Sequence, residues 1–282
     1  MQARLGLGLA ALGRPGYLNV GHGAELGADR SVAALRARTF DVLDFAYAQG
    51  IRDFDVARSY GRGEEFLGAW LRARNPAGVR ISSKWGYVYT ADWEVDRDPP
   101  EVKHHDVETF RRQLSETREH LGEWLNLYQI HSATPESGVL ANDEVLTAMQ
   151  ETDLPLGVSV SGPAQGETID AALATGLFDA VQATWNLHER AAEPALERVH
   201  AAGLKVYVKE ALANGRLARI DAEALAAALH RPWATVVLSG AASVDTLRSN
   251  LRALSTPAPG ERADLVEDSA AYWTRRSSLP WT

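Results

Sequence analysis

Three short stretches of the sequence place ionisable side chains at the ends of apolar runs. Residues 51–60 set a carboxylate, Asp55, five positions before a phenol, Tyr60. Residues 79–84 end on Lys84, and residues 125–131 end on His131. A phenol has a free pKa of about 10, which is too high for easy proton exchange at neutral pH. A nearby ammonium favours the phenolate and lowers that pKa, and a buried carboxylate pairs with the ammonium and holds it in place.

These four groups together suit the reduction of a carbonyl. His131 hydrogen-bonds and polarises the substrate oxygen, and Tyr60 gives a proton to that oxygen as a cofactor gives hydride to carbon. Each residue also has an ordinary structural explanation, because Asp55 could pair with Arg52 or Arg58 and His131 could be a satisfied core histidine. Their joint occurrence at the ends of successive strands favours catalysis.

The elements that must position these residues alternate along the whole chain. Apolar runs typical of buried strands occur at 4–10, 51–56, 79–84, 125–131, 156–161, 180–185, 205–209 and 235–239. Helical patterns occur at 31–49, 63–73, 106–121, 139–150, 167–175, 189–202, 221–229, 243–254 and 261–274, with Asp106 and Ser243 as expected N-caps. A long excursion at 85–105 and a Gly-rich loop from Gly13 to about Asp29 interrupt the alternation.

Eight strands alternating with helices in 282 residues predict an α/β fold of the (β/α)8 TIM-barrel type. We expect a single domain over residues 1–282, ending in a helix and a tail. A doubly wound open sheet is the alternative, but Gly6-Leu7-Gly8 followed by Gly13 does not fit the phosphate-binding turn G-x-G-x-x-G. In a barrel, polar residues at the C-terminal ends of the strands face one common active-site mouth.

The composition excludes several classes of function. The formal charge of −8 and the lack of a Lys/Arg run argue against a nucleic-acid surface. The absence of cysteine excludes disulfides, thiolate metal sites and a cysteine nucleophile. The apolar N-terminal run has no basic start and is interpreted as a strand, and no run approaches the roughly 20 apolar residues of a membrane span. We therefore expect a cytoplasmic monomer with no nucleic-acid or membrane partner. We expect no metal site either, and this applies also to the adjacent His104 and His105.

The order, spacing and strand placement of the motifs resemble the aldo-keto reductase superfamily. The motifs are Asp55-x4-Tyr60, Ser82-Ser83-Lys84 and Tyr128-Gln129-Ile130-His131, and further matches at 157–159, 181–186, 209–215 and 239–250 extend the resemblance over nearly the whole chain. The resemblance implies a (β/α)8 barrel that reduces an aldehyde or ketone reversibly with NAD(P)H. It also implies that Tyr60 is the general acid, that Lys84 and Asp55 tune it, and that His131 orients the carbonyl.

The resemblance also assigns residues to the cofactor. They are Ser159, Gln182, Trp185, Lys209, Leu212, Gly240, Ala241, Ser243 and Asn250. Two departures stand out, because Val160 replaces a common Asn and Lys209 stands where an aromatic side chain usually stacks on the nicotinamide. The positions that usually hold a basic partner for the 2′-phosphate carry no base, and only Arg248 lies near them. The cofactor is NADP(H) or NAD(H), and the cofactor usual in the family favours NADP(H).

The substrate is the least defined part of this interpretation. Trp85 and Trp93 in the excursion, with Trp281 in the tail, form an expected aromatic wall that suits a sugar ring or an aryl carbonyl. Asn19 and His22 in the first loop could add polar contacts. Two other classes remain open: a nicotinamide-binding barrel that acts as a regulatory or accessory subunit, and a barrel hydrolase or isomerase that needs no nicotinamide.

Overall fold

The computed structural model describes residues 3–20 and 25–281, and within them eight parallel strands close into a barrel. The strands are β1 (Arg4–Gly8), β2 (Asp53–Asp55), β3 (Arg80–Trp85), β6 (Leu125–Ala133), β7 (Leu156–Val160), β8 (Ala180–Thr184), β9 (Lys205–Lys209) and β10 (Val236–Ser239). Each strand pairs with its neighbours in chain order, and β1 closes the ring by pairing with β10 from Arg4–Val236 to Leu7–Ser239. The predicted (β/α)8 barrel is confirmed.

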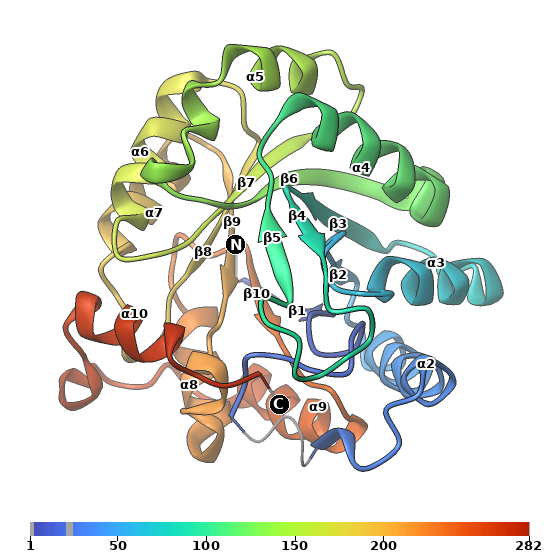
Figure 1. The fold of residues 1–282 in the computed structure, drawn as a ribbon. Coiled ribbons are helices and arrows are strands. Elements are labelled where there is room, and N and C mark those ends of the chain that lie inside the picture. The colour runs from blue at the N-terminus through green and yellow to red at the C-terminus, as the bar shows by residue number, and fades with distance from the viewer. Residues whose placement is uncertain (1–2, 21–24, 282) are drawn as a thin grey trace.

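Helices form the outer ring of the barrel (Figure 1). They are α2 (Val32–Ala48), α3 (Gly63–Arg74), α4 (Val107–Leu121), α5 (Asp143–Gln150), α6 (Gln165–Thr175), α7 (Glu193–Ala201), α8 (Asp221–Leu229), α9 (Val244–Leu251) and α10 (Ser269–Ser277). The two predicted N-caps are confirmed, since Asp106 accepts from Thr109 N at 2.7 Å and Ser243 accepts from Thr246 N at 3.1 Å. None of the helices in residues 3–20 and 25–281 is long and apolar enough to cross a membrane.

Several predicted boundaries are shifted in the structure, and that of the last helix is shifted most. The last helix was expected at 261–274, but α10 begins only at Ser269, where Asp268 caps it by accepting from Ala271 N at 2.9 Å. The excursion after Lys84 contains an antiparallel hairpin of β4 (Tyr87–Tyr89) and β5 (Glu101–Lys103). Three-residue strands are too short to give a periodic signal in the sequence.

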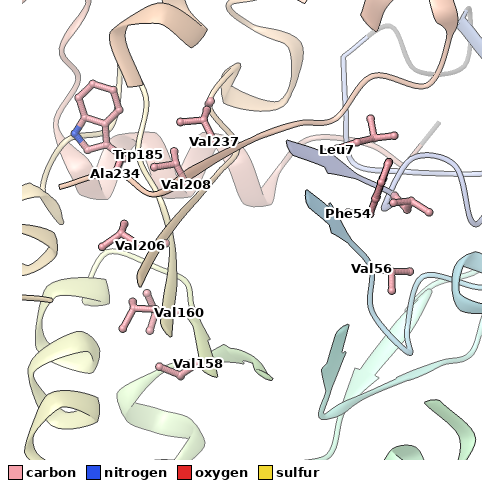
Figure 2. Packing of buried hydrophobic residues seen from close by; sticks show 14 of the residues in the cluster. Leu7, Phe54, Val56, Val158, Val160, Trp185, Val206, Val208, Ala234 and Val237 are labelled. Carbon is pink, nitrogen blue, oxygen red and sulfur yellow. The ribbon is translucent and has the colours of Figure 1, made fainter. Parts of the chain in front are cut away.

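Alternation along the strands separates two apolar layers. Leu127, Ala180, Tyr207, Val236 and Leu238 form one small buried cluster. The residues that alternate with them along each strand belong to a larger cluster, which packs the strands against the helices. Figure 2 shows part of this larger cluster, with Leu7, Phe54, Val158, Val206 and Val237 among the labelled side chains. Because successive side chains point to opposite faces of a strand, every second residue faces the interior of the barrel.

Strand β2 carries one inward carboxylate at each end. Asp53 pairs with Arg4 at 2.9 Å and with Arg80 at 2.6 Å, on the first residues of β1 and β3. Asp55 lies two residues further along, toward the C-terminal ends of the strands. Residues at the N-terminal face of such barrels serve stability, and those at the C-terminal face serve catalysis. The two aspartates therefore have different roles despite their shared strand.

Candidate active site

A buried ion pair at the C-terminal end of the barrel forms the base of the site. The Lys84 ammonium donates to the Asp55 carboxylate, to Val56 O at 2.9 Å and to the Tyr60 hydroxyl at 3.4 Å. Lys84 and Asp55 are almost fully buried. The structure thus brings three of the four predicted catalytic residues into one hydrogen-bonded group, and Asp55 pairs with neither Arg52 nor Arg58.

Asp55 is held by further donors from across the barrel. Its Oδ1 accepts from the Ser82 hydroxyl at 2.6 Å, from Gln182 Nε2 at 3.0 Å and from Gln129 Nε2 at 3.3 Å. These donors come from β3, β8 and β6, so the contacts cross the interior of the barrel. A carboxylate with this many donors has a fixed position, and it fixes the Lys84 ammonium in turn.

Close approach of two loops sets the position of Tyr60. The Arg62 amide donates to Gly13 O at 2.8 Å. A Cβ atom on Gly13 would lie 2.2 Å from Tyr60 O, and one on Gly61, whose φ is +56°, would lie 2.5 Å from Gly13 O. Only glycine fits at these two contacts. The loop after β1 is therefore in close contact with the turn that carries the Tyr60 phenol.

His131 meets Tyr60 from β6. The two rings pack edge to face with centroids 5.5 Å apart, and the ring of Tyr87 of the hairpin also packs on the imidazole, with centroids 5.0 Å apart. The Nδ1 atom of His131 lies 3.4 Å from the Ser59 hydroxyl. The imidazole and the phenol thus lie side by side, as a substrate oxygen held between them would require.

The pKa of Tyr60 differs from the expectation. Burial raises it well above 10, and the Asp55 charge raises it further, whereas the Arg14 guanidinium lowers it. The expected fall of the phenol's pKa below its free value is therefore wrong for this chain. Tyr60 is a protonated phenol at neutral pH, which is the form that can donate a proton.

Burial also controls the ionisation of His131. It lowers the pKa of the imidazole well below 6.5, and the nearby cations of Lys84, Lys209 and Arg14 lower it further. The imidazole is therefore neutral at physiological pH. A neutral imidazole cannot protonate the substrate fully, but it can orient an oxygen by a hydrogen bond.

A cavity of about 480 Å³ opens above these residues. Tyr60 and His131 line one part of it, together with Asp55. The predicted cofactor residues that line it are Gln182, Lys209, Leu212, Gly240, Ala241 and Asn250. Trp281 of the tail and Asn19 of the first loop also contribute to the wall, as expected. His22 lies outside the described residues.

Six predicted site residues lie off the cavity wall, and one of them is Lys84, which contacts Asp55 and Tyr60 on the wall. Trp85 and Trp185 are fully buried. The prediction that Trp85 contacts the substrate and that Trp185 contacts the cofactor from the wall is therefore wrong. Trp85 follows inward-facing Lys84, so its side chain points outward and packs on Phe110 at 5.0 Å. Trp185 likewise faces outward and packs on Trp233 at 5.7 Å.

The other three residues off the wall have different surroundings. The Trp93 indole donates to Arg30 O at 2.8 Å and fastens the excursion to the barrel, so its placement on the substrate wall is also wrong. Ser159 is fully buried next to Gln182, its register partner on β8. Ser243 caps α9 and donates from its hydroxyl to Glu25 Oε1 at 2.9 Å.

Of the two adjacent histidines, His105 is buried against the backbone of β6. His105 Nε2 lies 3.0 Å from His131 O, and burial lowers the pKa of His105 to about 4. Asp106 serves as the cap of α4. Across residues 3–20 and 25–281, no three histidine or acidic side chains gather in a way that could hold a metal ion.

The sequence motifs assign no role to several charged residues on the cavity wall. They are Arg14, Glu25, Glu101, Glu210 and Arg276. Glu210 accepts from Arg276 Nε at 3.0 Å with both oxygens, and this guanidinium holds the pKa of Glu210 below its usual range although burial would raise it. Arg14 had one signal, because it is the only Lys or Arg in the Gly-rich loop from Gly13 to Asp29.

Lys209 allows a test of the electrostatics of the site. Burial lowers its pKa to about 8, so below that pH the folded protein holds an ammonium that is poorly hydrated. The unfolded chain keeps the lysine charged up to about pH 10.4, so the folded wild type gains stability as pH rises from 8 to 10.4. We expect Lys209→Met to raise Tm at pH 7 by about 2–6 °C and to lose that advantage above pH 10.

Thermal melts of Lys209→Met and of Lys205→Met, at matched pH, make the comparison. Lys205 lies on the same strand with an exposed side chain. Its substitution should leave Tm nearly unchanged at every pH. A Lys209→Met protein whose Tm difference from the wild type stays constant from pH 7 to pH 10.5 would contradict the prediction.

The fold and the site define a (β/α)8 barrel with an acid–base group at the C-terminal ends of its strands. The sequence pattern of the aldo/keto reductase family matches residues 4–226, and the chain belongs to this family. The family comprises oxidoreductases of carbonyl compounds that use nicotinamide cofactors.

Solved structures agree with this fold. A proposed aldo-keto reductase of Pseudomonas aeruginosa, PA4992, is 24% identical, with a TM-score of 0.69 over 89% of this chain and 90% of that one. The aldo-keto reductase AKR11C1 of Bacillus halodurans, in its holo form, is 18% identical, with a TM-score of 0.69 over 98% and 92% of the chains. The glycerol dehydrogenase AKR11B4 of Gluconobacter oxydans is 17% identical, with a TM-score of 0.68 over 99% and 91%. A search of curated proteins finds no match.

Proposed function

We propose that the protein reduces an aldehyde or ketone to an alcohol, reversibly, with Tyr60 as the general acid and base. The observation that carries this proposal is the Tyr60 hydroxyl, which lies on the cavity wall and 3.4 Å from a buried ammonium. His131 orients the carbonyl oxygen, and the proton on Tyr60 Oη moves to that oxygen. Lys84 stabilises the phenolate that remains, and a proton from solvent restores the phenol. The nicotinamide, when bound, supplies the hydride.

Several features of the cavity fit a nicotinamide cofactor. The Ser159 hydroxyl is buried and has no hydrogen-bond partner among the described residues, beside the Gln182 amide that lines the cavity. These two groups would hold the carboxamide. Gly240 leaves open space where a side chain would stand, and the N-terminus of α9 follows it closely. A helix N-terminus suits an anionic phosphate.

The rival functions make different predictions. A regulatory barrel without catalysis would bind NADH or NADPH but would oxidise neither in the presence of a panel of aldehydes. A hydrolase or isomerase would not quench the fluorescence of either cofactor. The presence of Asp55, Tyr60, Lys84 and His131 in one site supports the enzyme.

The substrate side of the cavity is both aromatic and polar. The rings of Tyr17 and Trp281 pack edge to face at 6.1 Å, and Asn19 and Glu101 lie on the same wall. Aromatic faces with amide and carboxylate groups suit a polyhydroxylated carbonyl, and the aromatic faces alone suit an aryl aldehyde. Both belong in the substrate panel.

Glu25 bears on the choice of cofactor. Its carboxylate accepts from Ser243 at the start of α9, and it lines the cavity near Gly240. A carboxylate hydrogen-bonds a ribose 2′-hydroxyl and repels a 2′-phosphate. Arg248, the only nearby base foreseen from the sequence, is exposed and paired with Asp245 at 2.5 Å. We therefore expect NAD(H) to be preferred. This differs from the expectation of NADP(H), which rested on the cofactor most common in the family.

The measurement is parallel titration of the protein with NADH and NADPH, followed by cofactor fluorescence. We expect NADH to bind at least about tenfold more tightly, and Glu25→Gln to reduce that ratio by improving NADPH binding, since removing one like charge gains roughly 1 kcal/mol. Arg248→Gln is the matched control and should change neither affinity. Tighter NADPH binding by the wild type, weakened selectively in Arg248→Gln, would reverse the assignment.

A further inference from the structure

Arg14 is a buried cation packed against the ring of the proton donor. Its guanidinium lies 5.1 Å from the centroid of Tyr60, 5.1 Å from that of Tyr17 and 4.5 Å from that of Trp281. The residue is only 2% exposed. A cation in contact with an aromatic face is attracted to it, and the attraction is larger when water is excluded.

The hydrogen bonds of Arg14 tie it to the turn that carries Tyr60. Its Nη1 donates to Ser59 O at 3.2 Å and to Glu101 Oε2 at 2.9 Å, whereas its buried Nε has no partner among the described residues. Ser59 precedes Tyr60 directly. The glycine contacts between residues 13 and 61 hold the backbone of the two loops together, so Arg14 has little freedom to leave the phenol.

We propose that Arg14 is a positioning residue for Tyr60, which it holds from the face of the ring while it stabilises the phenolate left after proton transfer. The inference rests on the proposed role of Tyr60 as the acid. It gives the site a second cation besides Lys84, and the two differ in place. Lys84, from β3, lies 3.4 Å from the phenol oxygen and 4.9 Å from the ring centroid. Arg14, from the loop after β1, lies 5.1 Å from the same centroid and bonds to Ser59 O instead of to the phenol oxygen.

Other charges around Tyr60 also affect the pKa of its phenol. The charged and titratable groups that face the phenol are Asp55, Lys84, Arg14, His131, Glu101, Glu210 and Tyr17. Asp55, Glu101 and Glu210 raise the pKa of the phenol, and Arg14 lowers it. Arg14 and Glu101 therefore act on Tyr60 in opposite directions although they pair with each other. That opposition makes the proposal testable.

The test is the pH profile of alcohol oxidation, in which Tyr60 must act as the phenolate. In Arg14→Met the rising limb of kcat/KM should move up by about one pH unit, which lowers the rate at a fixed pH on that limb about tenfold. In Glu101→Gln, which keeps an oxygen to accept from Arg14, the limb should move down. Arg14→Lys keeps the charge, so its limb should stay near that of the wild type even if kcat falls.

A purely structural role for Arg14 makes a different prediction. It would lower kcat in Arg14→Met and in Glu101→Gln without moving the rising limb of either pH profile, and that result overturns the proposal. A limb that moves in the same direction in Arg14→Met and Glu101→Gln overturns it too. If Arg14→Met does not fold, Glu101→Gln decides alone, because a limb that fails to move down in this variant contradicts the opposing action of the pair.

A second measurement separates this proposal from the proposed function. Tyrosine labelled with carbon-13 at the hydroxyl-bearing ring carbon reports ionisation without turnover, and Tyr60→Phe identifies the Tyr60 signal by its loss. The signal should begin to shift at higher pH in Arg14→Met and at lower pH in Glu101→Gln. If the wild type reduced no carbonyl, the proposed function would fail, and these spectra would still decide whether Arg14 stabilises the phenolate.

Discussion

Replacing Tyr60 by phenylalanine should abolish carbonyl reduction and leave the nicotinamide bound. Loss of a positioned proton donor costs about 10²–10⁴-fold in rate, and we expect kcat of Tyr60→Phe to fall by at least the lower figure. The ring itself is retained, and with it the contacts to Arg14 and to His131. Steady-state rates with NADH and NADPH, with cofactor titration by fluorescence, measure the two effects separately.

Tyr89→Phe is the matched control for this substitution. It removes a phenol hydroxyl from a half-buried hairpin residue that does not line the cavity, so its kcat should remain within about twofold of the wild type. A Tyr60→Phe enzyme that kept more than a tenth of the wild-type rate would show that the proton comes from another group. A loss of cofactor binding in parallel would instead show that the phenol holds the cofactor.

The meeting of the proposed catalytic residues in one site could be predicted because strand ends obey a simple geometry. Asp55, Lys84 and His131 each end an apolar run, and in a parallel barrel such ends meet at one mouth. The same geometry explains the main errors. Trp85 follows Lys84 in sequence, but alternation along the strand turns its side chain to the opposite face, away from the cavity. Sequence proximity to a catalytic residue therefore does not place a strand residue in the site.

The remaining parts of the site depend on contacts that no local pattern records. Glu25 meets Ser243 across 218 positions, Arg14 meets Glu101 across 87, and Arg276 meets Glu210 across 66. The pKa of Tyr60 is a further case, because it depends on how deeply the phenol is buried and on the charges around it. The motif shows which groups meet, whereas the packed structure determines which of their opposing effects is larger.

Lys84→Met should damage both catalysis and stability. The substitution removes the ammonium next to the phenol, so kcat should fall by about 10²–10⁴-fold. It also leaves the Asp55 carboxylate buried, with only the neutral donors of Ser82, Gln129 and Gln182. Breaking a buried ion pair by removing one partner costs about 3–5 kcal/mol. We therefore expect a large drop in the free energy of unfolding, measured by urea denaturation.

The double variant Asp55→Asn/Lys84→Met separates these two losses. Neither charge remains, and replacing a buried pair by neutral groups of similar size is often close to neutral for stability. We expect the double variant to recover most of the unfolding free energy lost in Lys84→Met and none of the activity. If stability returned together with kcat, the ammonium would serve only to hold Asp55. If neither returned, the pair would be needed for folding as a unit, and the loss of rate in Lys84→Met would not report on the phenol.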